Sequence, residues 1–444
     1  MRRVIALTLC AAASAGAQSA DTKKCRPEFE RTTPASSFTR NQTASGKSIF
    51  DYSNGVKGHC AGTDMYMWAD SVHYVEDAGT ITLIGHARYL ERGNEITARQ
   101  LQYIEQDAHI IATGDVHIRT KRSTLTSQLA NYFRPVPGIR PASSAFAVGG
   151  PPHAVLRDTA GSKDTSVTII DGQRISMAAD SIFGAKGNAV INRTDLTAKA
   201  DSIEANSAKQ TMRLLGGNPH VEGLGTNKFS LDGNVLDVFG RERAIERLLA
   251  KGKAVAVNDS LKLTSDTLDI RMSRNHIDSV AAWGGGVAHA TSPDRDIRGK
   301  RIDLSMPGGR MRRLFAVGAA RADSKPDSTV HSPERDWIEG DTLTATFTVP
   351  KDTTKRPQLD TVIARGKARS FYHVAPKEKA DTIGGINYSS GTRIDIALKA
   401  NGKQDVHVIG QVHGMSLEAE KKDTTTGKAK AAAPKKPPPP RRVP

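Results

Sequence analysis

The sequence lacks the short motifs that mark common classes of enzyme. It contains no Gly-x-Ser-x-Gly, His-Glu-x-x-His, Walker or Gly-x-Gly-x-x-Gly phrase, which are typical of hydrolases, metalloproteases and nucleotide-binding proteins. Its histidines are scattered through the chain and it has only three cysteines, so no group of them indicates a metal site. We therefore expect a protein that is not an enzyme and that binds no cofactor and no metal ion.

The first residues form a short apolar run rather than a membrane span. Arg2 and Arg3 precede the apolar residues 4–13, and the small residues Ala15-Gly16-Ala17 follow. This order predicts a signal peptide over residues 1–17, cleaved before Gln18. The apolar run is too short to cross a bilayer. We therefore expect an exported, soluble mature protein.

Removal of this signal would leave two cysteines, Cys25 and Cys60. In an oxidising compartment an even pair predicts a disulfide, although two unrelated thiols remain the alternative. The surrounding residues 18–55 are polar, rich in Ser and Thr, and without periodicity. They predict a polar N-terminal arm, either a linker or poorly ordered, which the disulfide would tie to the first repeat.

The chain does contain a repeated phrase, about 30 residues apart with insertions, which is the range of repeat architectures. Its form is apolar–x–small–x–x–apolar–x–apolar, as in residues 263–270. A second phrase, centred on glycine, follows the well-preserved copies, and residues 245–256, 277–288, 311–322 and 359–370 match in register. The small residue of the first phrase is Ala69, Ala98, Ser127, Ala179, Ala200, Gly233, Ser265, Gly299, Gly340 and Gly391.

Both phrases alternate with a period of two residues, which predicts β-strands. In the second phrase one face is apolar or small, as at Leu248 and Ala250, while the other carries charge, as at Arg247 and Lys251. In the first phrase the apolar parity changes after the small residue, which requires a bulge or a corner there. We predict an all-β fold, an elongated and solenoid-like β-jelly roll whose units share one core.

The predicted interior is rich in Ala and Gly where a filled sandwich would carry larger side chains. Two interpretations remain open. Small residues let two sheets pack closely, or they leave the interior hollow for an elongated apolar ligand.

The repeats divide the chain into regions. We predict a first β-repeat region over 56–135, a Pro/Gly-rich loop over 136–172, and a second β-repeat region over 173–420. The second region contains polar insertions at 322–336 and 373–388. Residues 241–250 would be read as helix in isolation, but their register with the other copies predicts a strand. A disordered, Lys/Pro-rich tail is expected over 421–444.

Two neighbouring phrases, residues 96–103 (Ile-Thr-Ala-Arg-Gln-Leu-Gln-Tyr) and 111–118 (Ile-Ala-Thr-Gly-Asp-Val-His-Ile), resemble the OstA-like (LptA) repeats of lipopolysaccharide-transport proteins. The resemblance extends from about Met67 to about Glu420. It implies a V-shaped β-jelly roll in the periplasm that carries lipopolysaccharide acyl chains in an apolar groove. It also implies partners: lipopolysaccharide or a similar glycolipid, jelly-roll transport proteins of the inner and outer membrane complexes, and further copies joined end to end.

The formal net charge of +16 fits such a ligand. About +7 of it belongs to the tail after residue 420 and +2 to Arg2 and Arg3 of the signal peptide. The remaining charge of about +7 would give the body a basic rim suited to phosphates or acidic sugars. Nucleic acid, the usual rival for a basic protein, is disfavoured by the export signal and by the lack of a basic, aromatic-studded platform.

We therefore predict a periplasmic lipopolysaccharide-binding carrier or bridge protein. The alternative is a structural envelope scaffold with a filled core. A third possibility is a polysaccharide lyase or hydrolase using acids such as Asp266 and Asp341, although acids that recur after the small residue fit corner hydrogen bonding better. The predicted lipid-binding residues of the apolar face are Val72, Tyr74, Ile81, Leu83, Leu101, Tyr103, Leu236, Val238, Leu268, Ile270, Ile302 and Leu304.

Overall fold

The structure, a computed structural model, describes residues 25–157, 167–179, 181–224, 228–242, 244–258, 261–274, 276–326, 330, 332–352, 355–374, 385–398 and 404–417. The predicted signal peptide and the predicted tail lie outside these ranges. Within them, no helix is long and apolar enough to cross a membrane.

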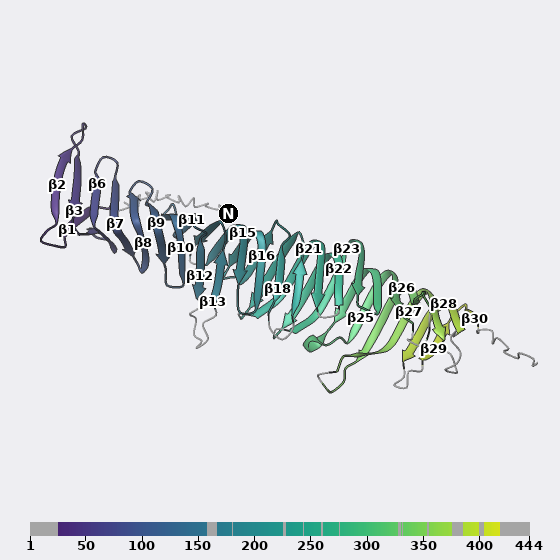
Figure 1. Ribbon diagram of the computed structural model, residues 1–444. Coiled ribbons are helices and arrows are strands. Elements are labelled where there is room, and N and C mark those ends of the chain that lie inside the picture. The colour runs from purple at the N-terminus through teal and green to yellow at the C-terminus, as the bar shows by residue number, and fades with distance from the viewer. Residues whose placement is uncertain are drawn as a thin grey trace, which may run out of the picture.

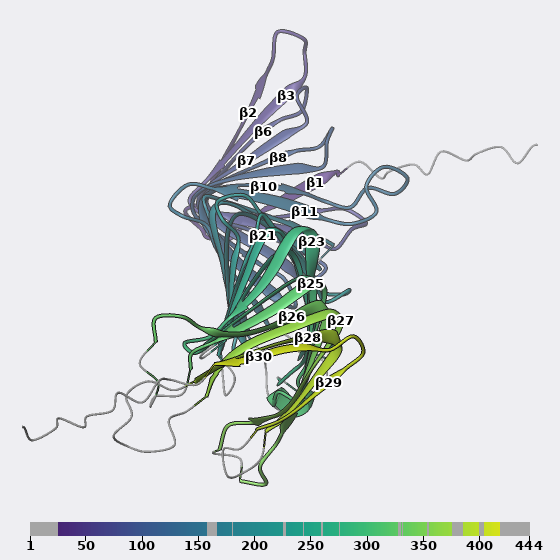
Figure 2. The same cartoon turned by 90° about the vertical axis from the view of Figure 1, so that its right-hand side faces the viewer.

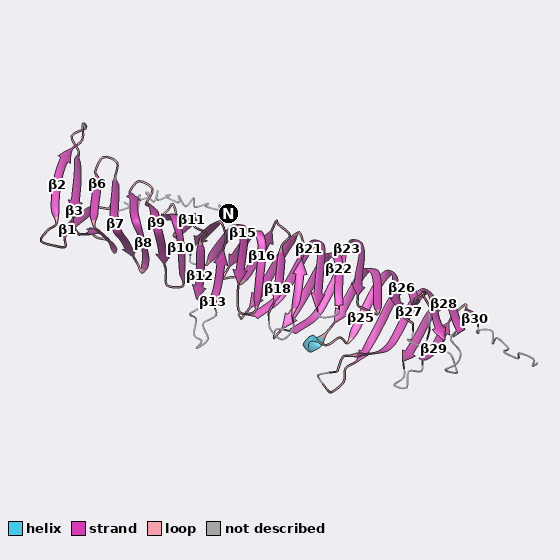
Figure 3. Ribbon diagram, viewed as in Figure 1, coloured by secondary structure: helices cyan, strands magenta, loops and turns pink. Residues whose placement is uncertain are grey.

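The described residues form an all-β protein in which thirty strands make one antiparallel sheet, stacked into an elongated body (Figure 1). The fold class predicted from the repeats is confirmed. The one helical turn among the described residues is η1 (Pro307–Gly309), which Figure 3 shows beside the stack. The strands of the N-terminal half are β1 (Pro27–Arg31), β2 (Ser37–Gln42), β3 (Ser48–Ser53), β4 (Val56–Cys60), β5 (Met65–Ala69), β6 (Ser71–Val75), β7 (Thr80–Glu91), β8 (Asn94–Ile104), β9 (His109–Arg119), β10 (Ser123–Phe133), β11 (Ser144–Val148), β12 (His153–Arg157), β13 (Val167–Asp171), β14 (Arg174–Ala178) and β15 (Ile182–Asn192). Those of the C-terminal half are β16 (Leu196–Asn206), β17 (Thr211–Leu215), β18 (His220–Gly223), β19 (Phe229–Asp232), β20 (Val235–Arg241), β21 (Ala244–Asn258), β22 (Leu261–Ser273), β23 (His276–Thr291), β24 (Arg295–Ser305), β25 (Arg313–Ser324), β26 (Asp336–Thr348), β27 (Gln358–Val374), β28 (Gly385–Leu398), β29 (Gln404–Ile409) and β30 (His413–Leu417).

Each repeat phrase forms one bent rung of the stack. The first half of β7 pairs with β6, from Thr80 to Ile84, and its second half pairs with β5, from Arg88 to Glu91. A rung therefore has two arms that meet at a corner, and long strands such as β8 and β22 supply both arms. We call the arm that holds β4, β5 and residues 87–91 arm A, and the arm that holds β3, β6 and residues 80–84 arm B. Successive rungs rotate about the long axis (Figure 2), as the twist of β-sheets requires.

The corner of a glycine-centred rung is a β-bulge. In β21 the pairing with β22 slips between Lys251 and Ala254, and both Gly252 and Lys253 adopt positive φ angles, +74° and +52°. A Cβ on Gly252 would lie 2.6 Å from Asn234 Nδ2 and 3.0 Å from Asn234 Cβ. Position 252 therefore requires glycine for two reasons: its φ is positive, and Asn234 of the neighbouring rung approaches it closely. Asn234 directly follows Gly233, the small residue of that rung's first phrase.

The change of parity predicted for the first phrase is present. On β8 the buried residues are Ile96 and Ala98 before the corner, then Leu101 and Tyr103 after it. The buried side chains of both arms therefore lie on the same side of the bent strand, inside the bend. The buried residues from Cys25 to Ile394 form one continuous core. Residues 241–250, which a helical reading would also fit, lie largely in strand β21, as their register predicts.

The prediction of an arm without regular structure over 18–55 is wrong for its described part. β1, β2 and β3 lie within it. β1 pairs with β4, with Pro27 opposite Cys60 and Arg31 opposite Val56, and Cys25 and Cys60 form a disulfide. The polar composition has a physical reason: these strands end the sheet, and β2 is exposed along its whole length. The exposed Ser and Thr side chains of β2 hide the apolar alternation.

The prediction of one loop over 136–172 is also wrong, because β11, β12 and β13 lie inside it. β11 pairs with residues 129–133 of β10 and β12 pairs with residues 123–126, so the two short strands are the arms of one rung. The Gly149–Pro152 run is an enlarged corner between them. Since these prolines lie between strands, they remove no hydrogen bond from the ladder.

Candidate functional site

The twelve residues predicted to bind lipid all lie on the inner face of arm B. They form two cross-strand rows, in which Val72 pairs with Leu83 and Leu83 with Leu101, while Tyr74 pairs with Ile81 and Ile81 with Tyr103. Eleven of the twelve are buried, and Tyr74 is half-buried. Burial, together with the carboxylates of Glu105 and Glu76, raises the pKa of Tyr74 to about 12.

The facing residues of arm A were missing from this prediction. Ile96, Leu125 and Leu263 are no more than 3% exposed and form part of the opposite wall. Their signal was present in the first phrase, since each is the apolar residue that opens it, two positions before the small residue. Because the strand bends at the small residue, the opening residue belongs to the other arm.

A pocket opens between the tips of the two arms near the middle of the stack. Its volume is about 210 Å³. Ile170 and Ile191 line it from arm A, and Phe183, Met212 and Val238 line it from arm B. Val238 is the one predicted lipid-binding residue that lines it. Its lining is mixed, because polar side chains such as Gln210 and Thr211 lie beside these apolar ones.

Three arginines stand at the arm A rim of this pocket. Arg122 and Arg193 belong to turns at the arm A tip, Arg157 is the last residue of β12, and Arg157 N donates to Arg122 O at 2.8 Å. Arg193 is paired with Asp195 at 2.8 Å. Arg122 and Arg157 are exposed, and within the described ranges no carboxylate lies at ion-pair distance from either. Guanidinium groups bind phosphate in a bidentate manner, so the rim suits an anionic head group above an apolar chain.

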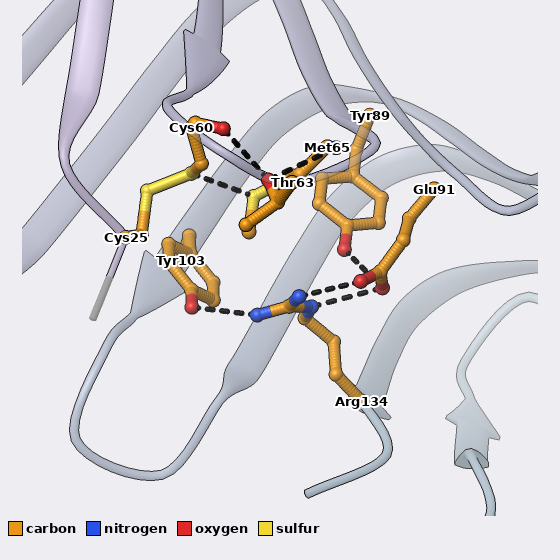
Figure 4. Close-up of a disulfide and its surroundings, with 8 residues drawn as sticks. All are labelled: Cys25, Cys60, Thr63, Met65, Tyr89, Glu91, Tyr103 and Arg134. Carbon is orange, nitrogen blue, oxygen red and sulfur yellow. Dashed lines mark hydrogen bonds and ion pairs between the residues drawn. A yellow bond between two sulfur atoms is a disulfide. The ribbon is translucent and has the colours of Figure 1, made fainter. Parts of the chain in front are cut away.

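Nearer the N-terminus the mouth of the V is closed by a polar cluster (Figure 4). Glu91, at the arm A end of β7, accepts hydrogen bonds from Arg134, which follows β10 on arm B. Arg134 Nη1 also donates to Tyr103 Oη at 2.9 Å, and Tyr89 Oη donates to Glu91 Oε2 at 2.8 Å. The side chains of Glu91 and Arg134 are only 8% and 15% exposed.

The electrostatics of this cluster favour the charged pair. Burial by itself would raise the pKa of Glu91, but the hydrogen bonds and charge of Arg134, with the Tyr89 hydroxyl, outweigh it and lower the pKa. Burial raises the pKa of Tyr103 and of Tyr89, so both hydroxyls stay protonated. No sequence pattern predicted the Glu91–Arg134 pair.

The acids considered for an enzyme lie at the corners, away from the pocket. Asp266 Oδ2 accepts a hydrogen bond from Gly286 N at 3.2 Å, and Asp341 lies against Gly366 in the next rung. Such acids stand next to the bulge glycines. Among the described residues, no group of three or more His, Cys, Asp or Glu side chains could hold a metal ion.

Bent rungs, two facing apolar arms and a pocket between the arm tips define an open β-jelly roll with a lateral groove. Residues 95–244, from β8 to the start of β21, match a family model described as LptA/(LptD N-terminal domain) LPS transport protein. This match, over about a third of the chain, supports the resemblance to the OstA-like family for these residues. Every residue that lines the pocket falls within the matched range. No curated protein compared with the chain matches it.

Proposed function

We propose that this protein is a periplasmic carrier or bridge that binds lipopolysaccharide and shelters its acyl chains in the groove during transport to the outer membrane. The observation that carries the proposal is the pocket itself. It has apolar residues on both arms and a cationic rim, and it lies wholly within the residues that match the transport family. Burial of acyl methylenes contributes about 0.8 kcal/mol each, and the rim arginines would add contacts to phosphate.

The dense packing elsewhere favours a second candidate. Most inner-face residues of both arms are almost fully buried against one another, as expected for a structural envelope scaffold with no lipid ligand. Acyl chains longer than the pocket would have to separate the arms. For either candidate we propose no catalytic activity, no cofactor and no nucleic-acid partner.

A photo-crosslinker at Val238 distinguishes the two candidates. Val238 faces the pocket, whereas its neighbour Phe239 lies on the outer face, where Arg247 stacks on its ring. With purified lipopolysaccharide, we expect labelling at Val238 at least tenfold above that at Phe239. Equal labelling at the two positions would leave the scaffold as the better account. The readout is the mass of the crosslinked protein.

We further propose that copies of the chain, or related jelly rolls of the membrane complexes, join end to end. At the C-terminal end of the described stack, β29 and β30 pair with β28 alone, and Val412, Met415 and Leu417 are each more than half exposed. At the other end β1 pairs only with β4 and β2 only with β3. Open edges of this kind add a strand from a partner.

Light scattering over a range of concentrations tests this association. We expect wild-type oligomers to grow with concentration and Met415→Lys to remain monomeric, because a lysine on an edge strand opposes pairing. Ile84→Lys is the matched control, since Ile84 is an exposed apolar residue in mid-sheet on β7, and it should assemble like wild type. A wild-type chain that stays monomeric throughout would refute the proposal.

A further inference from the structure

The mouth of the groove differs between β7–β10 and β12–β21. Over β12 to β21 the arm tips leave the pocket open. Over β7 to β10 the tips are joined by the hydrogen bonds of Arg134 to Glu91, which cross from arm B to arm A. Tyr89 on arm A donates to Glu91, and Tyr103 on arm B accepts from Arg134 (Figure 4). The two regions are adjacent along one continuous core.

The cluster is built to hold the arms together. Glu91 and Arg134 lie 43 residues apart in the chain, and the bonds between them are among the few polar contacts buried inside the V. Both carboxylate oxygens of Glu91 accept a hydrogen bond, and Arg134 donates from three nitrogens. A second bond across the mouth joins Asn94 Nδ2 to Tyr132 Oη at 3.2 Å. Spreading these rungs would leave a buried charge on each arm without its partner.

The interior beneath the cluster is filled. Tyr89, Ile81, Leu83, Ile96 and Leu101 are each at most 1% exposed. On the N-terminal side the disulfide adds a further restraint, and Cys60 Sγ lies 3.2 Å from Met65 Sδ in the same core. An acyl chain could enter this part only if the arms separated.

We infer that the Glu91–Arg134 pair is a latch that closes the groove over β7–β10 and confines bound acyl chains to the groove on its C-terminal side; this inference rests on the proposed lipid-carrying function. Glu91 and Arg134 are thus positioning residues that decide which part of the groove takes lipid. Of the twelve predicted lipid-binding residues, the six from Val72 to Tyr103 lie on β6–β8, either in the rungs that the latch closes or on their N-terminal side. They contact lipid only when the latch opens.

Photo-crosslinkers at Leu101 and at Val238 test the latch in the full chain with purified lipopolysaccharide. In wild type we expect labelling at Val238 and only background at Leu101. In Glu91→Ala/Arg134→Ala, which removes both charges and leaves none buried alone, we expect Leu101 labelling to rise at least tenfold. The control is Glu95→Ala/Arg119→Ala, which removes the ion pairs of Glu95 with Arg119 and with Arg88 on the arm A outer face and should behave like wild type.

Each outcome has one meaning. Equal labelling at Leu101 and Val238 in wild type overturns the latch, and this comparison needs no variant to fold. Leu101 labelling that stays at background in the alanine pair, with the strand signal in circular dichroism retained, overturns it too. The charge swap Glu91→Arg/Arg134→Glu should restore the wild-type pattern, and failure to do so while folded counts against the latch. No labelling at Val238 in any chain refutes the proposed function instead.

Discussion

We expect Ala205→Trp to weaken lipopolysaccharide binding at least tenfold and to leave the fold intact. Ala205 is a half-buried pocket residue near the arm B tip, so a large side chain there extends into the 210 Å³ pocket without removing any buried contact. The indole occupies the space that an acyl chain needs, and we expect the dissociation constant to rise at least tenfold, which corresponds to about 1.4 kcal/mol or more. Binding is measured with fluorescent lipopolysaccharide.

Ala281→Trp is the matched control. Ala281 lies on β23 beside Asp269 and Asp303, on the outer face of arm B. It receives the same added volume on the opposite side of the sheet. Binding by this variant should equal that of wild type. A loss of affinity in both variants would mean that tryptophan acts through stability, and unchanged binding by Ala205→Trp would place the ligand elsewhere.

Arg134→Gln destabilises the rungs around β7–β10. The substitution leaves the Glu91 carboxylate buried without its cation, and removing one partner of a buried pair typically costs about 3–5 kcal/mol. Because rungs of a stack contact mainly their neighbours, the loss should be local. Hydrogen exchange is therefore the appropriate measurement, and we expect faster exchange in β7–β10 with little change in β21–β27.

The pH dependence of this effect follows from Glu91. Its pKa is lowered in the folded protein from an ordinary value of 4.5, so the pair contributes its full stability above pH 4.5. That contribution is lost as the pH falls through the lowered pKa, because the carboxyl must then take up a proton. The difference in exchange between wild type and Glu91→Gln should be largest at neutral pH and disappear in acid. A difference that persists unchanged in acid would contradict the assigned role of the pair.

The strand repeat and its corner could be predicted because they are local. Few backbone conformations allow the apolar parity of a strand to change after a small residue beside a rung centred on glycine. The β-bulge at Gly252 and Lys253 is one of them. Where composition hid the alternation, prediction failed. β2 is exposed on both faces at the sheet end, and β11 and β12 are separated by an enlarged corner that reads as a loop.

The site was harder to predict, because it forms between residues far apart in the chain. The pocket depends on the distance between the arm tips that carry Ile170 and Val238. Its rim arginines lie in turns or at a strand end, where no periodicity marks them. Arg134 reaches Glu91 across three strand connections. A repeat pattern predicts which residues pair within a rung and with its neighbouring rungs. It does not predict contacts between the tips of arm A and arm B.

Native mass spectrometry of the gently purified, full-length protein, followed by lipid extraction, tests most directly whether the groove holds lipid. We predict an added mass that is released as an acylated, phosphorylated glycolipid and that is absent from Ala205→Trp. A wild-type protein that carries no lipid, and takes up none when lipopolysaccharide is supplied, would contradict the lipid-carrying role and leave a structural stack of strands.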